Sequence, residues 1–149
     1  MKLRTIGLIS TLALGLLAAL VPAEAQQAKK VPIIGFLSAG PGASRTPLKE
    51  GLRELGYVEG QHFNIVNRGT YGKSERYPRF VTELIRLPVD VIVAANVTAA
   101  LAAKKVTSTI PIVVVTGADF VRSGLVASLA RPGGNVTGFS MSAPELGSK

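Results

Sequence analysis

The sequence predicts an α/β fold in which a doubly wound, mainly parallel five-stranded sheet is covered by helices on both faces. Short apolar runs bounded by turn residues alternate along the chain with segments of helical periodicity, which is typical of a parallel sheet with helical crossovers. The third and fourth runs are almost entirely β-branched or small apolar residues, as strands buried on both faces require. We expect these two runs at the centre of the sheet. The strands are predicted at residues 33–37, 63–67, 89–95, 110–115 and 136–141.

Two of the expected helices lie in the middle of the chain. Apolar side chains recur with helical spacing at residues 77–85, and this stripe is expected to pack on the sheet. Ser74 is the expected N-cap of that helix, and Pro78 is tolerated because it falls near the first turn. The alanine-rich segment at residues 98–105 is helical by propensity, and its small side chains would let it lie close to the strands.

Two further helices are predicted from shorter apolar stripes. Glycine or proline follows each stripe and marks the end of its helix. We expect both stripes to belong to the core. The stripes are Leu48, Leu52 and Leu55 before Gly56, and Leu125, Val126 and Leu129 before residues 132–134.

The first 25 residues have the pattern of a cleaved export signal. Lys2 and Arg4 precede an apolar run at residues 6–21, and a small-x-small pattern ends at Ala25. The run is shorter than the roughly 20 apolar residues of a membrane-spanning helix, which favours cleavage after Ala25 over a retained anchor. We therefore expect a periplasmic protein in which residues 26–149 form one domain.

The composition argues against several kinds of site. The chain has no cysteine, which excludes disulfides and thiolate metal sites, and its one histidine, His62, supplies neither a metal ligand set nor a well-placed catalytic base. The formal net charge of +8 comes from scattered basic residues without a nucleic-acid-binding motif. Residues 35–42 contain neither a Walker loop nor G-x-G-x-x-G spacing. We expect no metal, no cofactor, no nucleic-acid partner and no enzymatic activity.

Polar and glycine residues follow the predicted strands at their carboxyl ends. Ligands of open α/β sheets bind beyond this edge, where helix N-termini aim free backbone N–H groups at them. The same residue types also cap helices and form turns whatever the function, and Ser123 is expected to be a plain N-cap. The residues expected to bind a small ligand are Ser38, Ala39, Gly40, Asn96, Thr98, Thr116, Gly117 and Asp119.

Longer stretches of the chain carry a second, independent signal. They are I-G-F-L-S from residue 34, G-L-R-E-L-G-Y-V-E-G from 51, V-D-V-I-V-A from 89, A-A-L-A-A-K from 99, T-S-T-I-P-I-V from 107 and S-G-L-V-A-S-L-A-R-P-G-G-N-V-T-G from 123. In order and spacing these stretches resemble the ABC transporter substrate-binding proteins that are grouped with periplasmic tryptophan and tyrosine binders. Together they span nearly all of residues 26–149.

This resemblance implies the N-terminal, flavodoxin-like lobe of a type I periplasmic binding fold, which closes on its ligand by hinge motion. It implies an ABC permease in the inner membrane as partner, and ligand contacts at Ser38, Asn96, Thr98, Gly117 and Asp119. Proteins of this family continue into a second lobe, so we expect this chain to be a single lobe with the second one missing. An unpaired lobe would expose its cleft face, and we expect weak self-association through that face.

Three functions follow from these observations. The leading one is the solute-binding component of an ABC importer, which recognises a small organic molecule such as an amino acid without any chemistry. The second is an exported α/β hydrolase-like enzyme that uses Asp119 and a strand-end serine, although no base is placed to activate the nucleophile. The third is a remnant lobe that binds no ligand.

Overall fold

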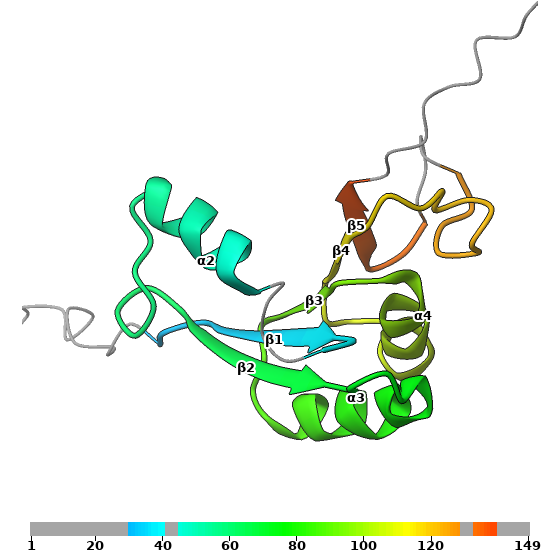
Figure 1. Ribbon diagram of the computed structural model, residues 1–149, viewed down its shortest axis with the longest axis horizontal. Coiled ribbons are helices and arrows are strands. Elements are labelled where there is room, and N and C mark those ends of the chain that lie inside the picture. Colours follow the sequence, from blue (N-terminus) through cyan, green and yellow to red (C-terminus); the bar gives the residue numbers. More distant parts are fainter. Residues whose placement is uncertain (1–29, 41–44, 129–132, 140–149) are drawn as a thin grey trace, which may run out of the picture. The chain divides into compact units, whose positions relative to one another are not determined.

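The computed structural model describes residues 30–40, 45–128 and 133–139, and the elements below lie within the unit Val31–Lys149. In these residues five parallel strands form one sheet in the order β2-β1-β3-β4-β5 (Figure 1). The strands are β1 (Ile33–Ser38), β2 (Asn64–Gly69), β3 (Val91–Ala94), β4 (Ile112–Val115) and β5 (Val136–Phe139). The predicted α/β fold with a parallel sheet is confirmed.

The strands lie where the sequence predicts them, with differences at their ends. The two predicted central runs are interior: β3 is the middle strand, and β4 lies between β3 and β5. β3 begins at Val91, two residues later than predicted, and the carboxylate of the preceding Asp90 accepts a hydrogen bond of 2.8 Å from the Ile33 N–H. β2 begins one residue later than predicted, at Asn64. The last two residues of the predicted fifth strand lie outside the described residues.

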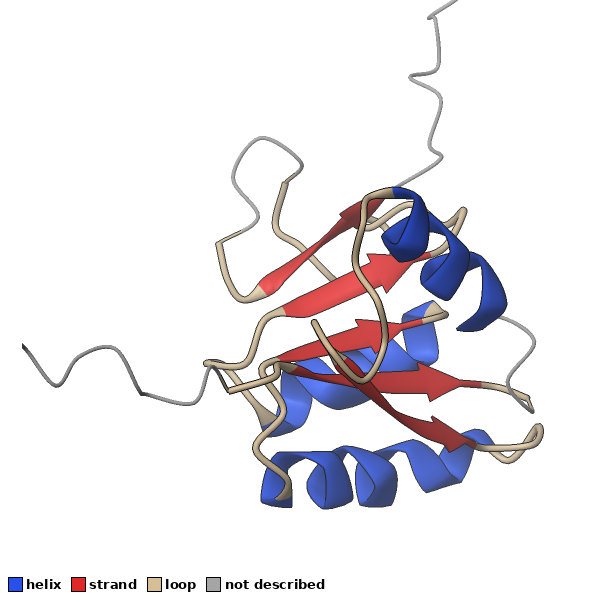
Figure 2. Cartoon of the chain, turned by 90° about the vertical axis from the view of Figure 1, so that its left-hand side faces the viewer, coloured by secondary structure: helices blue, strands red, loops and turns tan. Residues whose placement is uncertain are grey.

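Two helices, α3 (Tyr77–Arg86) and α4 (Val97–Val106), pack on one face of the sheet (Figure 2). Tyr77, Val81 and Leu84 of α3 are buried in the main core, together with four alanines of α4. Full burial of a valine or leucine side chain, such as Val81 or Leu84, is worth about 1.5–3 kcal/mol. These two helices confirm the predicted stripe and the alanine-rich segment.

The start of α3 differs from the expected cap. Ser74 opens a short 3₁₀ turn, η2 (Ser74–Arg76), and Arg76 occupies the N-cap position of α3 without a side-chain hydrogen bond to the helix. The predicted Ser74 cap is therefore wrong, because the chain turns once before the α-helix begins. Pro78 lies in the first turn of α3 as predicted.

The helix α2 (Arg45–Glu54) lies on the opposite face of the sheet. Side chains alternate between the two faces of a strand, so Phe36 and Val93 point away from the core that contains Leu37 and Ala94, and Leu48 approaches them there. No residue of α2 is buried, and Leu55, just beyond it, is 75% exposed. The helix is confirmed, but the expectation that its stripe belongs to the core is wrong.

The predicted helix around Leu125 and Val126 is also wrong within the described residues. The segment forms turns: Gly124 adopts φ +74°, and the Asp119 carboxylate accepts hydrogen bonds from two following backbone N–H groups. Ser123 donates its hydroxyl to the Phe120 carbonyl rather than capping a helix. Leu125 and Val126 are buried as expected, whereas Leu129 lies outside the described residues. Apolar spacing thus predicted burial correctly, but the local hydrogen bonds favour turns.

No helix in the described segments combines the length and the apolar character needed to cross a membrane. The predicted export signal lies outside the described residues, so cleavage after Ala25 stays a prediction.

A charged cluster joins the edge strand β2 to α3. The Glu83 carboxylate accepts hydrogen bonds from Arg68 of β2 at 3.1 Å and from Arg79, one helical turn earlier, at 2.9 Å. These hydrogen bonds, first from Arg79 and then from Arg68, lower the pKa of Glu83 below its ordinary value of 4.5. The cluster therefore stabilises the folded state only while Glu83 is ionised.

We predict that Glu83 contributes to stability at neutral pH and that this contribution disappears in acid. Because the folded-state pKa is depressed, the contribution is fully present above the unfolded pKa of about 4.5 and is lost as the pH falls through the lower folded value. Urea unfolding of the chain and of Glu83→Gln between about pH 3 and 8 measures it. The two free energies of unfolding should converge in acid; a difference that stays constant over the whole range contradicts the prediction. Glu54→Gln, a change at a carboxylate without an ion pair among the described residues, is the control.

Candidate functional site

The order of the strands reverses direction beside β1. The chain passes from β1 to β2 on one side, and every later strand is added on the other side, beginning with β3. Loops that leave the carboxyl ends of two such neighbouring strands diverge, and the crevice between them is the usual ligand site of open α/β sheets. The residues after β1 and β3 are therefore the leading candidates for contact with a ligand.

The loop after β1 is held by its own hydrogen bonds. Ser38 is 1% exposed, and its hydroxyl donates to the Gly40 carbonyl at 2.8 Å. The carbonyls of Ser38 and Ala39 accept hydrogen bonds of 3.0 Å from Thr70 and Gly72, in the loop after β2. Ser38 thus fixes the turn, while Ala39 is exposed at the edge and can face a ligand through its backbone.

This loop approaches β2 so closely that a glycine is needed there. A Cβ atom on Gly69, the last residue of β2, would lie 2.8 Å from the Gly40 carbonyl oxygen. The next residue, Thr70, is fully buried, and its hydroxyl is one of two buried side-chain groups without a hydrogen-bond partner among the described residues; the other is the Asn67 carbonyl. Both atoms are closed to solvent, and an ordered water is the usual partner of such a buried polar group.

Asn96 follows β3 and has both side-chain groups engaged. Its carbonyl accepts a hydrogen bond of 2.8 Å from the Ala99 N–H as the N-cap of α4, and its amide donates to the Tyr77 hydroxyl at 2.8 Å. Asn96 therefore joins the starts of α3 and α4. Thr98, in the first turn of α4, is exposed and remains available to a ligand.

The third predicted loop follows β4. Thr116 is half-buried and Gly117 is exposed. Asp119 uses its Oδ1 to accept hydrogen bonds from Val121 at 2.8 Å and Arg122 at 3.0 Å, so it also closes a turn. Ser38, Asn96 and Asp119 thus have structural roles that sequence reasoning treated as alternatives to binding.

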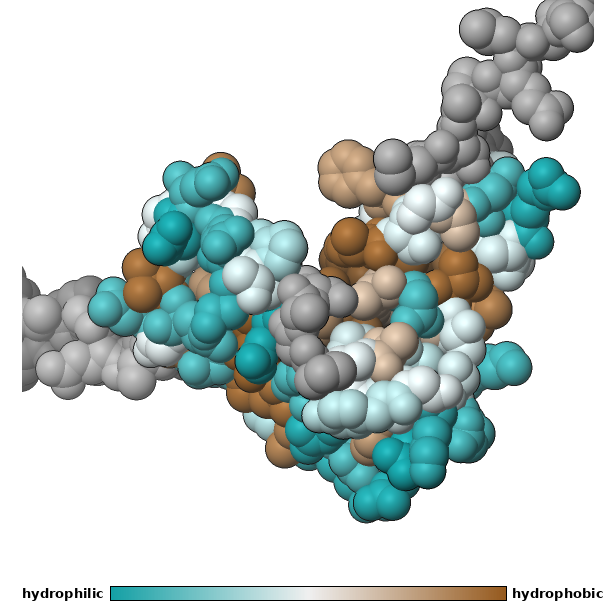
Figure 3. Space-filling model, viewed as in Figure 1, coloured by the Kyte–Doolittle hydropathy of each residue, from teal (hydrophilic) through white to brown (hydrophobic). Residues whose placement is uncertain are grey.

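Beside this edge lies an apolar hollow of ≈ 440 Å³ that we call the edge hollow. It opens on the face of the sheet that carries α2, next to the ends of β1, β3 and β4. Val115, the last residue of β4, is 54% exposed there. Figure 3 shows apolar surface beside β4 and β5, across the notch that separates them from α2. The lining residues are Phe36, Pro47, Leu48, Val93, Ala95 and Val115.

Sequence reasoning missed the edge hollow because it placed most of these residues in strands and assigned Leu48 to a core stripe. Apolar residues on a strand indicate burial but do not say by what they are covered. The signal that could have found it is topological. Right-handed crossovers place the β1–β2 helix on one face and the next two helices on the other, so that α2 is the only helix on its face among the described residues.

The groups at this edge are apolar side chains, backbone groups and hydroxyls. Among the described residues no group of three or more His, Asp or Glu side chains could hold a metal ion. His62 lies in the loop before β2, where its Nδ1 accepts a hydrogen bond from the Val58 N–H at 3.0 Å. It is thus engaged at the opposite end of the strands from Asp119. The apolar, backbone and hydroxyl groups of the edge can hold a ligand by non-covalent contacts.

A sequence profile of the ABC transporter substrate binding proteins matches residues 27–146. Among characterised proteins, the tyrosine-binding protein of Clostridioides difficile (strain R20291) is 33% identical over 89 residues, which are 60% of this chain and 26% of that protein. The chain thus spans about a quarter of the length of this relative.

The chain also resembles solved structures. The chain resembles an ABC domain from Streptococcus pneumonia in complex with L-Trp, with a TM-score of 0.66 and 27% identity over 73% of this chain and 38% of that one. A conserved domain protein from Vibrio cholerae matches with a TM-score of 0.69 and 30% identity, over 74% and 39% of the two chains. A ligand-free, open substrate binding protein with adhesive properties from Clostridium difficile matches with a TM-score of 0.67 and 29% identity, over 74% and 39%.

We predict that Asn96 is needed for stability. Asn96→Ala removes the helix cap and leaves the buried Tyr77 hydroxyl without its donor, so the free energy of unfolding should fall by about 1–2 kcal/mol. Urea denaturation measures the change. Asn96→Asp keeps the cap acceptor and should cost less.

Thr98→Ala, at an exposed position in the same helical turn, is the control and should change stability by less than about 0.5 kcal/mol. If Asn96→Ala is no more destabilising than this control, the capping role is wrong.

Proposed function

This chain belongs to the family of ABC transporter substrate-binding proteins, and we propose that it binds a small organic ligand with an apolar, preferably aromatic, side group, such as an aromatic amino acid. The family is one of binding proteins rather than enzymes, in agreement with the sequence-based expectation. The proposed binding site is the carboxyl edge of the sheet together with the edge hollow.

The observation that carries this proposal is the position of the edge hollow. It adjoins the point where the strand order reverses, and its lining is apolar, from Phe36 and Val93 on the sheet to Leu48 on α2. Pockets for small ligands are mostly apolar with a few polar groups that set orientation. Exposed or half-buried polar groups at this edge include the hydroxyls of Thr98 and Thr116 and the backbone at Ala39, Gly40 and Gly117.

The relatives support the same class of ligand. One is a tyrosine-binding protein, and one solved structure holds L-Trp. Tyrosine and tryptophan both carry a flat aromatic ring, which the edge hollow suits by its size and its apolar lining. The polar backbone and hydroxyl groups of the edge would then bind the amino acid's ionic groups.

The remaining parts of the proposal concern the location of the protein, its partner in the membrane and a second lobe. We propose that the chain is exported, with cleavage after Ala25, and that it delivers its ligand to an ABC permease in the inner membrane. We further propose that the described lobe forms one wall of the site and that a second lobe supplies the other, since closure between two walls excludes water and raises affinity. Self-association through the exposed face stays a prediction.

The hydrolase alternative is not favoured. It requires a base beside Asp119, and His62, the chain's one histidine, is engaged in the loop before β2. Asp119 itself accepts two backbone hydrogen bonds. Its carboxylate is therefore committed to the turn.

Isothermal titration of the purified chain with L-tryptophan, L-tyrosine and L-serine tests the proposal. Burial of an aromatic group in the edge hollow should favour the aromatic amino acids over serine by at least about tenfold in Kd. Equal binding of all three, or no binding of any at about 10 mM, contradicts it.

A matched pair of variants locates the site. Val115→Thr adds a hydroxyl to the edge hollow and should weaken binding of L-tryptophan by about threefold or more. Val106→Thr makes the same change on α4, at a position 43% exposed, and should leave binding unchanged. Equal effects of the two changes would place the ligand elsewhere.

A further inference from the structure

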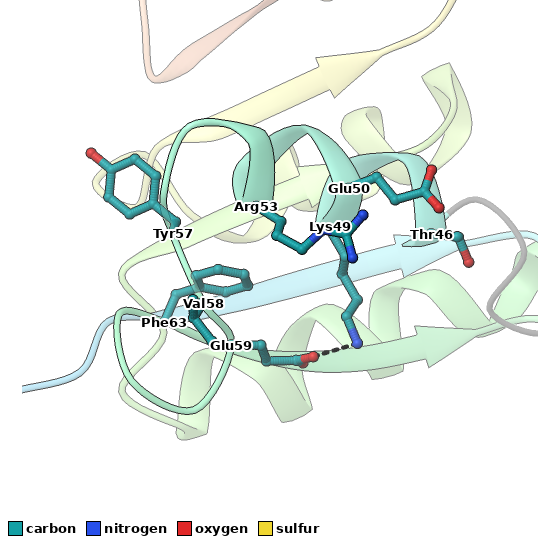
Figure 4. A pocket seen from close by; sticks show the side chains of 8 residues that line it. All are labelled: Thr46, Lys49, Glu50, Arg53, Tyr57, Val58, Glu59 and Phe63. Atoms are coloured by element: carbon teal, nitrogen blue, oxygen red, sulfur yellow. Dashed lines mark ion pairs between the residues drawn. The ribbon is translucent and has the colours of Figure 1, made fainter.

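A second hollow, which we call the side pocket, lies along a different face of α2. It has a volume of ≈ 270 Å³ and is bounded by α2 and by the loop that joins α2 to β2 (Figure 4). Thr46, Lys49, Glu50 and Arg53 line it from the helix. Their spacing of three and four residues places them on one helical face. Pro47 and Leu48, by contrast, line the edge hollow.

The loop wall of the side pocket is held in place by its own hydrogen bonds. The Tyr57 N–H donates to the Leu52 carbonyl at 2.8 Å, and the Gly60 N–H donates to the Phe63 carbonyl at 2.7 Å. His62 reinforces the turn, since its Nδ1 accepts from the Val58 N–H and its ring packs edge-on against Tyr57. A ligand would therefore meet a wall that needs little ordering, which reduces the entropic cost of binding.

The floor of the side pocket is apolar. Phe63 is 5% exposed, and its ring lies beneath α2 beside Val58, as Figure 4 shows. A volume of ≈ 270 Å³ is below the range of about 300–1,000 Å³ usual for drug-sized ligands. The pocket is thus suited to one aromatic ring with a short polar chain.

The rim supplies one available cation. Lys49 is paired with Glu59 across the pocket, whereas Arg53 makes no ion pair among the described residues. With Glu50 also present, the four charged side chains sum to zero, which disfavours phosphate-rich or dicarboxylate ligands. A guanidinium binds a single carboxylate through two parallel hydrogen bonds and can also stack on an aromatic ring.

We propose that the side pocket is a binding site for a small aromatic monocarboxylate, with the ring on Phe63 and Val58 and the carboxylate on Arg53. The site is separate from the edge hollow and does not depend on the function proposed there. α2 borders both hollows and buries none of its own residues. A ligand in the side pocket would therefore also influence the position of α2 over the sheet.

Titration of the ¹⁵N-labelled chain with phenylacetate, followed by two-dimensional NMR, tests this proposal. Saturable shifts should concentrate at the amides of residues 49–63, and Arg53→Gln should weaken binding by about tenfold. Arg86→Gln, the same change at an exposed position on α3, is the control and should have no effect.

Absence of shifts at residues 49–63 up to about 10 mM phenylacetate, or equal binding by Arg53→Gln and the unchanged chain, overturns the proposal. Shifts confined to residues 39, 40, 96 and 116 also overturn it, because they would mean that phenylacetate occupies the carboxyl edge. A parallel titration with L-tryptophan reports on that edge separately, so failure of one site is distinguishable from failure of the other.

Discussion

The reversal of strand order beside β1 is the constraint on which the rest of this structure depends. Crossovers between parallel strands are right-handed, so a change in the direction of strand addition moves the connecting helix to the other face. α2 therefore lies on one face and α3 and α4 on the other. The same reversal separates the loops after β1 and β3, and it leaves apolar side chains such as Val115 only partly covered. The candidate site is a consequence of topology as much as of residue type.

Much of the fold could be predicted from the sequence because each local pattern agrees with its final environment. The apolar stripe of α3 and the small residues of α4 both find the core that their spacing indicates. The prediction failed where short-range hydrogen bonds compete with a helical pattern. Around Gly124, a positive φ and the turn closed by Asp119 replace the expected helix, although Leu125 and Val126 are still buried. Periodicity predicts which side chains are buried better than it predicts backbone conformation.

The site was predicted less well than the fold. The sequence indicates the correct edge, but Ser38, Asn96 and Asp119 fix turns or cap a helix. Which of two roles a polar strand-end residue takes depends on whether a backbone N–H or carbonyl lies within reach, and this is not visible in one sequence. The edge hollow and the side pocket were missed for a different reason. Both depend on how α2 sits over the sheet, with none of its residues buried.

The central claim is that a ligand's apolar group occupies the edge hollow while its polar groups face the carboxyl edge. Intermolecular nuclear Overhauser effects between L-tryptophan and the methyl-labelled chain test this claim most directly. We predict contacts from the indole ring to the methyl groups of Leu48, Val93 and Val115, all of which line the hollow. Contacts from the ring to Val58 beside α2, or to Val106 on the opposite face, without contacts to these three residues, would contradict the account.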